Sequence, residues 1–421
     1  MLKVLLPWKL ESYKLINGYH PLLASFVDAC PDGMEFVVPD DSSTFGDEEV
    51  KRVTFEYIRE TLLFGGLAAA GNADVTKWVN GLMFSRNPAD QMRIESYAGK
   101  VDVVFHHTAP VHLSTIPFVL HFESLTTLFC PYLSMGETRD VNLREQAAFG
   151  LVKRTLESDA CRGVFTHLKG SRDALVKSFA SDKIAEKTQY VPLGVTAPVD
   201  FEERIVQKIQ GIPQRRGLNI LFTNSAHARV GNFFLRGGVE LLLAFQRLLE
   251  SAPDATLTIV SKRPPFELFQ NLNMRNVVWI EEPIDDAKLY ELLLDADVFA
   301  LPAAGLHSYS ALRALKFGAV LICSDAPGYD EYVVDGETGI VVPGRLAQIY
   351  QPDPETGWMR DDYSSALTWQ PPIAERLGDA LERLAANPEE RHRIAAAAYD
   401  HVARHHAMGP WVQGIAAMLG A

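Results

Sequence analysis

Short apolar runs of strand length alternate with helical stretches along the first half of the chain. This rhythm is typical of parallel sheets, because two neighbouring parallel strands need a crossover connection between them. The strands predicted here are Lys3–Leu6, Glu35–Pro39, Val101–Phe105, Phe118–His121, Gly163–His167 and Thr188–Pro192. The first half of the sequence therefore predicts a parallel sheet covered by helices.

A polar segment interrupts this rhythm near the middle of the chain. Charged side chains gather at Glu202–Arg204 and at Arg215–Arg216, so we expect residues 201–217 to connect two domains. The rhythm then starts again. The expected strands are Asn219–Thr223, Thr256–Ser261, Val277–Ile280, Val298–Pro302 and Val320–Ser324, and the expected helices are Gly238–Glu250, Asp286–Asp295 and Ser308–Phe317. Two series that each begin with a strand predict an α/β protein of two Rossmann-like domains, 1–200 and 218–406.

Residues 347–372 depart from this pattern. They are rich in Pro, Asp, Tyr and Trp, and we expect a long irregular excursion of the second domain. Excursions of this length inside a compact domain are often functional, although a plain surface loop is the alternative. Helical patterns follow at Ala374–Ala386 and Pro388–His405, and we expect a final helix over about 407–421 to pack back on the first domain.

Composition agrees with two folded domains and limits the partners. Of the 421 residues, 47% are hydrophobic and 22% are charged, which is sufficient for sizeable cores. The net charge of −13 argues against broad electrostatic binding to nucleic acid or to an anionic membrane. The apolar runs fall short of the roughly 20 residues that span a bilayer, and the N-terminus has the pattern of a first strand rather than of a signal peptide.

The cysteines bear on the cellular compartment. Cys30, Cys130, Cys161 and Cys323 lie far apart with no paired spacing, which fits neither a zinc site nor a disulfide framework. The sequence therefore predicts a reduced, cytoplasmic protein. A peripheral position at the inner membrane face stays open, although the acidic balance argues against it.

Three loops that follow predicted strands carry the candidate chemistry, since ligands of open α/β sheets bind beyond the carboxyl ends of the strands. The first loop holds Arg236, Gly237 and Gly238 directly before a leucine-rich helix. The two glycines allow close approach to a ligand, and the guanidinium can bind a diphosphate. A plain turn before an amphipathic helix is the alternative interpretation.

The second loop, Pro302–Ser310, leads into the predicted helix Ser308–Phe317. Ser308 or Ser310 can cap this helix and leave its amides facing a phosphate. We expect His307 and Tyr309 beside them to contact the same ligand. Capping alone remains the alternative for the serines.

The third loop begins at His121 and Glu123, where the strand Phe118–His121 ends in a polar pair. A histidine at a strand end beside a carboxylate is well placed to bind substrate hydroxyl groups, and we take these two residues as the catalytic candidates. A structural histidine is the alternative.

The remaining histidines indicate no metal site. His106, His107, His112, His405 and His406 lack the i, i+4 pairing with a nearby acid that marks a helical zinc site. The sequence also contains no Gly-x-x-x-x-Gly-Lys-Ser/Thr phosphate loop. We therefore expect neither a metal ion nor a cofactor.

Several motifs in the second half follow one another in the order of a known family. They are Asn219–Phe222, Arg236–Gly238, Ala296–Pro302, Ala314–Val320, Ser324–Val333 and Asp335–Pro343. Over Leu218–Arg345 the chain resembles the donor-binding half of family-4-type retaining glycosyltransferases, the glycosyltransferase group 1 enzymes of GT-B fold. The first half is similar more faintly, at Asp102–His107, Pro117–His121, Thr166–Ser171 and Val191–Val195.

The resemblance implies a cleft between two Rossmann-like domains and a nucleotide-sugar donor bound without an obligatory metal. A hexosyltransferase-like enzyme would transfer the sugar, with retention of configuration, to a glycan, lipid-linked or small-molecule acceptor on the first domain, in glycan, polysaccharide or glycolipid synthesis. The resemblance also implies that a basic pair supports the leaving diphosphate. It puts a histidine at position 121 on the donor sugar, Gly18 in the loop after the first strand, and Arg313 and Glu331 in the donor site.

The chain departs from the family pattern at its most informative positions. The family usually carries two glutamates eight positions apart, where this chain has Gly305 and Arg313, and the second glutamate normally holds the ribose. Gly231 stands where the arginine of the basic pair is expected, so Arg229 is the candidate substitute. Two hypotheses stay open: an active glycosyltransferase, or a degenerate GT-B protein that binds a nucleotide, a glycan or a protein partner.

Overall fold

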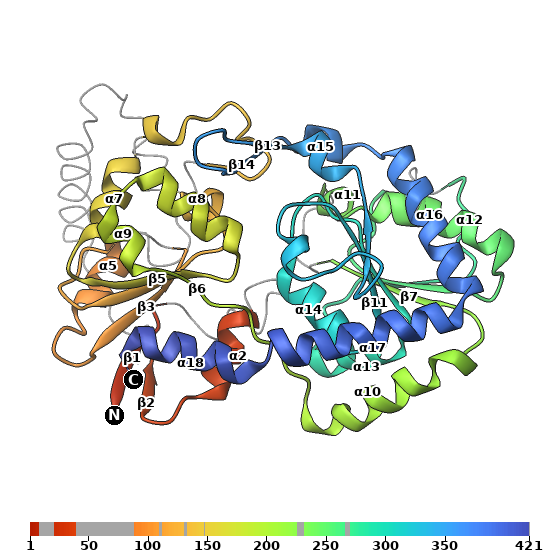
Figure 1. Ribbon diagram of the computed structural model, residues 1–421, viewed down its shortest axis with the longest axis horizontal. Helices are drawn as coiled ribbons and strands as arrows, with labels where there is room; N and C mark the ends of the chain where they lie inside the picture. The colour runs from red at the N-terminus through yellow and green to blue at the C-terminus, as the bar shows by residue number, and fades with distance from the viewer. Residues whose placement is uncertain are drawn as a thin grey trace.

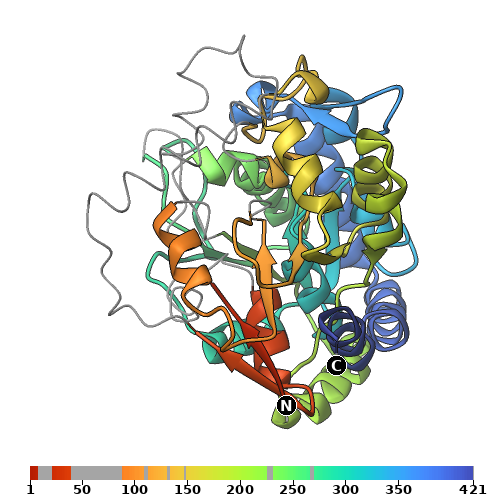
Figure 2. The same ribbon diagram turned by 90° about the vertical axis from the view of Figure 1, so that its left-hand side faces the viewer.

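The chain folds into two lobes that lie side by side, each built on one sheet (Figure 1). The computed structural model describes residues 1–7, 21–38, 88–108, 112–129, 133–146, 148–224, 231–265 and 270–420. The candidate residues Gly18 and Arg229 lie outside these ranges. Both chain ends lie on the same side of the N-terminal lobe (Figures 1 and 2).

The N-terminal lobe contains a parallel sheet with the strand order β2-β1-β3-β4-β5-β6. The strands are β1 (Leu2–Leu5), β2 (Met34–Val37), β3 (Val103–His107), β4 (Phe118–His121), β5 (Cys161–Thr166) and β6 (Thr188–Tyr190). Every residue of β3 and β4 is buried, as expected for parallel strands covered on both faces. The helices are α2 (Pro21–Ala29), α5 (Pro88–Glu95), α6 (Leu125–Leu128), α7 (Phe149–Glu157), α8 (Lys169–Phe179) and α9 (Asp182–Lys187).

The C-terminal lobe repeats this architecture with the strand order β12-β11-β10-β7-β8-β9. The strands are β7 (Asn219–Thr223), β8 (Thr256–Val260), β9 (Val277–Ile280), β10 (Val298–Leu301), β11 (Val320–Ser324) and β12 (Ile340–Val342). The order reverses between β7 and β10, and ligands of open α/β sheets bind beyond the carboxyl ends at such a reversal. The helices around it are α11 (Gly231–Leu235), α12 (Gly238–Ser251), α13 (Asp286–Asp295), α14 (Ser308–Lys316), α16 (Pro371–Ala386) and α17 (Pro388–His405).

The predicted linker is a helix of the C-terminal lobe. Residues expected to form a connection over 201–217 instead form α10 (Val199–Gly211) and a 3-10 turn at Ile212–Gln214. Phe201 on α10 packs against Phe317, with ring centroids 5.8 Å apart. Of the charged residues that suggested a linker, Glu202, Glu203 and Arg204 belong to this amphipathic helix, and Arg215 and Arg216 follow the turn.

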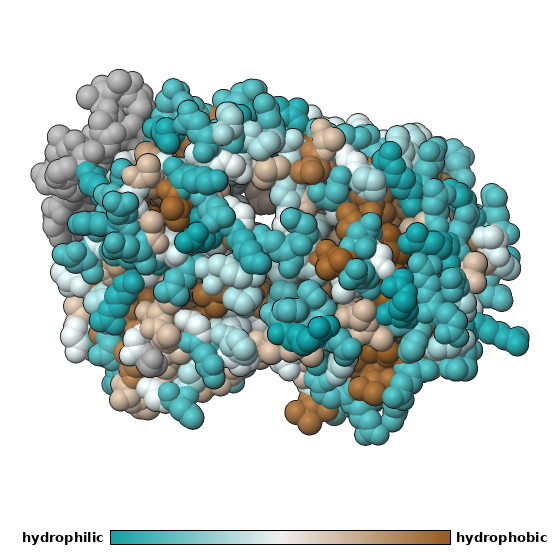
Figure 3. Space-filling model, in the orientation of Figure 1, coloured by the Kyte–Doolittle hydropathy of each residue, from teal (hydrophilic) through white to brown (hydrophobic). Residues whose placement is uncertain are grey.

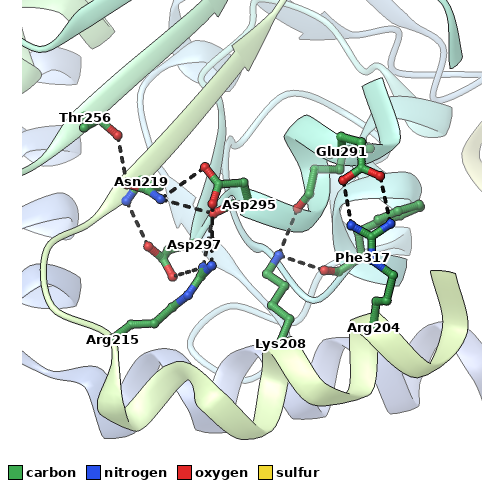
Figure 4. A network of polar contacts seen from close by, with 10 residues as sticks. Arg204, Lys208, Arg215, Asn219, Thr256, Glu291, Asp295, Asp297 and Phe317 are labelled. Atoms are coloured by element: carbon green, nitrogen blue, oxygen red, sulfur yellow. Dashed lines mark hydrogen bonds and ion pairs between the residues drawn. The ribbon is translucent and has the colours of Figure 1, made fainter. Parts of the chain in front are cut away.

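Polar contacts fix α10 to the neighbouring helices (Figure 4). The Lys208 ammonium donates to the carbonyls of Leu293 at 2.9 Å and of Phe317 at 2.8 Å. Both carbonyls lie at the ends of helices, where backbone oxygens lack a partner within the helix. Arg204 adds a bidentate pair with Glu291 on α13. Burial lowers the pKa of Lys208 to about 7.

The predicted irregular excursion contains regular structure. After α15 (Arg345–Ile349), the strands β13 (Tyr350–Pro352) and β14 (Met359–Asp361) form an antiparallel hairpin, and a 3-10 turn follows at Ser364–Leu367. The hairpin reaches from the C-terminal lobe to the N-terminal lobe (Figure 1). We refer to residues 350–363 as the bridging hairpin.

The last helix, α18 (Met408–Leu419), returns to the N-terminal lobe. Trp411 is fully buried and meets Phe165 of β5 with ring centroids 5.9 Å apart. A Cβ atom on Gly163 of β5 would lie 2.5 Å from the Met418 side chain, so this strand and α18 pack closely. Among the residues described, no helix is long and apolar enough to cross a membrane.

Candidate functional site

A cavity of about 480 Å³ lies between the two lobes, at the carboxyl ends of their sheets. Figure 3 shows the surface hollowed between the lobes, beneath the bridging hairpin. The polar side chains that line the cavity come from the N-terminal lobe, the C-terminal lobe and the hairpin. They include Glu123, Thr127, His167, Asn224, Arg236, His307, Ser308, Tyr309, Ser310, Arg313, Tyr350, Asp361 and Tyr363.

Arg236 supplies positive charge to the cavity wall. Its guanidinium lies 3.4 Å from the Thr223 carbonyl at the end of β7, to which it donates. Burial lowers the pKa of Arg236 to about 10, so the side chain is still charged at neutral pH. Burial, together with the nearby Arg236 charge, also lowers the pKa of His307 well below its ordinary value. The wall therefore presents a cation beside a neutral imidazole.

Gly237 has a packing function in this wall. Its φ is 74°, and a Cβ atom there would lie 2.4 Å from the Pro302 carbonyl oxygen. Only glycine fits this left-handed position against the loop that follows β10. Gly237 is not among the lining residues that the structure describes, but it allows the Arg236 loop and the β10 loop to meet.

The start of α14 differs from the predicted cap. The N-cap residue is His307, and no described side chain caps the helix. Ser308 and Ser310 line the cavity, but the Ser308 hydroxyl bonds instead to His167 Nε2, at 3.0 Å. The prediction that a serine caps this helix was wrong, because Ser308 is the first helical residue rather than the cap. The first-turn amides and the helix dipole favour an anion at this end of the cavity.

His121 lies one layer below the cavity. It is fully buried, and the lining residues in the described ranges do not include it. Its Nδ1 lies 2.8 Å from His107 Nδ1, and its Nε2 lies 3.0 Å from His167 Nδ1. Of the predicted catalytic pair, Glu123 lines the cavity directly. On the N-terminal side of the cavity, His167 is the histidine among the described lining residues. The prediction missed it, although it follows β5 as His121 ends the adjacent β4.

Arg313, which stands in the place of a family glutamate, is a compensated cation. Its guanidinium lies 3.0 Å from an Asp286 carboxylate oxygen. The group also lies 4.5 Å from the Tyr309 ring centroid and 5.2 Å from that of Tyr290. The Asp286 carboxylate therefore compensates the Arg313 charge, and of the two neighbouring rings Tyr309 also lines the cavity.

Glu331 connects the two lobes. Its carboxylate accepts the backbone amides of Lys169 at 2.7 Å and of Gly170 at 3.1 Å, at the start of α8. An acidic side chain is stabilising at the positive end of a helix. Glu331 is outside the described lining of the cavity, and the structure places it at the interface between the two lobes.

The bridging hairpin contributes lining residues that the sequence did not indicate. Tyr350 and Tyr363 place their hydroxyl groups 3.2 Å apart at the cavity. No group of three or more His, Cys, Asp or Glu side chains in the described ranges is arranged to hold a metal ion. The described lining thus combines the Arg236 guanidinium, the Glu123 and Asp361 carboxylates, the tyrosine hydroxyls and the helix amides.

Comparison with known proteins finds a family match within the C-terminal lobe. A family model described as Glycosyl transferases group 1 matches residues 228–351. The D-inositol 3-phosphate glycosyltransferase of Corynebacterium diphtheriae is 28% identical over 206 residues, which are 42% of this chain and 48% of that protein. The alpha-maltose-1-phosphate synthase of Mycobacterium tuberculosis is 32% identical over 114 residues, or 26% of this chain and 27% of that protein. The chain thus spans half or less of these relatives.

Solved structures agree with the whole fold. HepE of Anabaena, crystallised with UDP, is similar over 100% of this chain and 99% of its own, with a TM-score of 0.58 and 15% identity. A trehalose 6-phosphate synthase of Burkholderia multivorans covers 99% of this chain and 98% of its own, with a TM-score of 0.58 and 13% identity. The chain is therefore a GT-B-fold protein whose C-terminal lobe carries the segment characteristic of the group 1 glycosyl transferases.

Proposed function

We propose that the protein is a glycosyltransferase that binds a nucleotide-sugar in the cavity and transfers the sugar to an acceptor. One observation carries this proposal: Arg236 and the start of α14 converge on a cavity at the reversal of strand order between β7 and β10. A nucleoside diphosphate fits such a position, because both groups favour negative charge. The UDP and UDP-glucose complexes of HepE support the same class of donor.

The chemistry needs charge stabilisation at the leaving group. The bond from the anomeric carbon to the diphosphate breaks with its electron pair on the phosphate oxygen. The acceptor hydroxyl oxygen forms the new bond, and its proton passes to that phosphate oxygen on the same face, so configuration is retained. Arg236 and the amides of α14 would oppose the developing charge, and such preorganised groups provide a large share of catalysis.

The acceptor would lie against the N-terminal lobe. Glu123 and Thr127 line that side of the cavity and offer hydrogen-bond partners to a hydroxyl-rich molecule. The names of the two relatives, D-inositol 3-phosphate glycosyltransferase and alpha-maltose-1-phosphate synthase, each contain a phosphorylated polyol or sugar, which supports a polar acceptor. We propose that no metal takes part, since Arg236 and α14 already supply positive potential at the diphosphate.

Ligand binding tests this proposal. Thermal unfolding would be measured with UDP, GDP, ADP and their sugar conjugates, since a ligand at 100 times its Kd stabilises the folded state by about 2.7 kcal/mol. At least one nucleotide should raise the Tm, and Arg236→Ala should abolish that shift. Arg216→Ala is the matched control, because Arg216 is exposed. If no nucleotide shifts the Tm, the chain is not a nucleotide-sugar enzyme, and binding of a glycan or protein partner becomes the better explanation.

A further inference from the structure

The bridging hairpin forms a third wall of the cavity, and most of it lies beyond the segment 228–351 that matches the family model. It is held firmly on the N-terminal lobe. Trp358 is 4% exposed and is part of the hydrophobic core of that lobe. The Thr138 amide donates to the Asp361 carbonyl at 2.8 Å, and Arg139 pairs with Asp362 at 3.2 Å. Groups that the hairpin presents to the cavity are therefore fixed relative to both lobes.

Two hydroxyl groups of the hairpin form a short directed chain. The Tyr350 hydroxyl donates its proton to the Ala304 carbonyl at 2.8 Å. The Tyr363 hydroxyl, 3.2 Å away, must therefore be the donor toward Tyr350 Oη, because a phenol has only one proton. Burial raises the pKa of Tyr363 to about 12, so this group is neutral. Tyr363 Oη is left with acceptor capacity at the cavity.

Gly305 provides the space for this pair. A Cβ atom at Gly305 would lie 2.8 Å from Tyr363 Oη and 3.5 Å from Tyr350 Oη, whereas the Tyr363 ring carbon Cζ would be 3.9 Å away. The hydroxyl alone causes the conflict. The Tyr363 hydroxyl can therefore occupy its position only because residue 305 has no side chain.

We propose that Tyr363 Oη accepts a hydrogen bond from a hydroxyl group of the donor's sugar and so contributes to sugar specificity. The two hydroxyl groups lie beside Gly305. Gly305 belongs to the loop after β10 that also leads to His307 and Ser308, where the diphosphate is proposed to bind. The sugar is the part of the donor that follows the diphosphate, and a neutral acceptor suits a neutral hydroxyl. This inference rests on the proposed function.

Calorimetric titration of two ligands tests the inference. The probes are the nucleoside diphosphate that binds most tightly and its sugar conjugate. Tyr363→Phe should leave the Kd of the diphosphate within about twofold and weaken the sugar conjugate about fivefold, the range expected for one hydrogen bond. A conjugate that lacks the recognised hydroxyl should bind the wild type and Tyr363→Phe equally. Tyr399→Phe is the matched control. The Tyr399 hydroxyl donates to a Glu202 carboxylate oxygen at 3.0 Å, and this pair is outside the described lining of the cavity.

A second variant separates recognition from packing. Gly305→Ala should lower the Tm, and the double variant Gly305→Ala with Tyr363→Phe should recover the Tm of Tyr363→Phe, because the clash is with the hydroxyl. Equal weakening of both ligands by Tyr363→Phe, or no weakening of either, would overturn the inference while the proposed function stands. If the wild type binds none of the nucleotides or conjugates, the proposed function fails and the inference fails with it.

Discussion

His167 Nε2 lies 3.0 Å from Ser308 Oγ, and this contact joins the end of β5 in one lobe to the start of α14 in the other. Two further histidines extend it into the N-terminal lobe, since His167 bonds to His121 and His121 bonds to His107. All four side chains are buried. A neutral imidazole has one donor and one acceptor nitrogen, so neutral histidines in this hydrogen-bonded series all donate in the same direction. That direction decides whether the Ser308 hydroxyl donates to His167 or accepts from it.

Removal of the His167 ring should destabilise the protein. His167→Ala should lower the free energy of unfolding by about 1–3 kcal/mol, because it leaves buried partners without a hydrogen bond. His167→Gln keeps one donor and should cost less. Urea unfolding measures both, with His405→Ala at an exposed position as the control. A loss for His167→Ala no larger than that of the control would contradict the prediction.

The two ends of the interdomain contact should act as a unit. Ser308→Ala and His167→Ala should be non-additive, with a coupling of about 0.5–3 kcal/mol in a double-mutant cycle of unfolding free energies. The measurement needs four proteins: the wild type, the two single variants and the double variant. Additive effects would mean that this contact does not stabilise the folded chain.

The bridging hairpin should depend on its buried tryptophan. Trp358 is 4% exposed, so Trp358→Ala should cost about 3–5 kcal/mol of unfolding free energy. Trp369 belongs to the same excursion but is 52% exposed, and Trp369→Ala should change stability by less than about 0.5 kcal/mol. Chemical denaturation compares the pair. Similar losses for both would show that the hairpin is not anchored through Trp358.

Stability should fall on mild acidification. Burial lowers the pKa values of His112 and His406 to about 4, whereas the ordinary value is 6.5. Between these values the unfolded chain binds protons that the folded chain does not, so stability is complete above pH 6.5 and is lost as the pH falls toward 4. The Tm should therefore decrease steadily from pH 7 to pH 5. His406→Asn can keep the bond to the Leu193 carbonyl, and its Tm should depend less steeply on pH.

The fold followed from the sequence more fully than the site did. Strands such as Phe118–His121 and Asn219–Thr223 have the predicted bounds, because parallel strands covered on both faces contain short apolar runs. The helix α10 was misread as a linker, since its charged residues dominate the local composition, although Phe201, Ile205 and Ile209 recur at the four-residue spacing of a buried helix face. A helix whose apolar face is narrow shows its periodicity only over several turns.

The site depends on contacts that are distant in sequence. Tyr363 and Gly305 are 58 positions apart in the sequence, and no local pattern connects them. His167 could have been predicted. The parallel strands β4 and β5 are neighbours, β4 ends at His121, and His167 directly follows β5. Glu331 belongs to a motif of the second half, but its carboxylate accepts a backbone amide at the start of α8 in the other lobe. This contact depends on how the two lobes meet, which a sequence motif does not specify.

Release of nucleoside diphosphate from a panel of nucleotide-sugars tests the central claim most directly. The wild type should release diphosphate from at least one donor, and Arg236→Ala should do so about 100-fold or more slowly, because it removes a group aimed at the leaving charge. Arg216→Ala should turn over at the wild-type rate. Release from no donor, or an equal rate for Arg236→Ala and the wild type, would contradict the assignment of the cavity as a glycosyltransferase site.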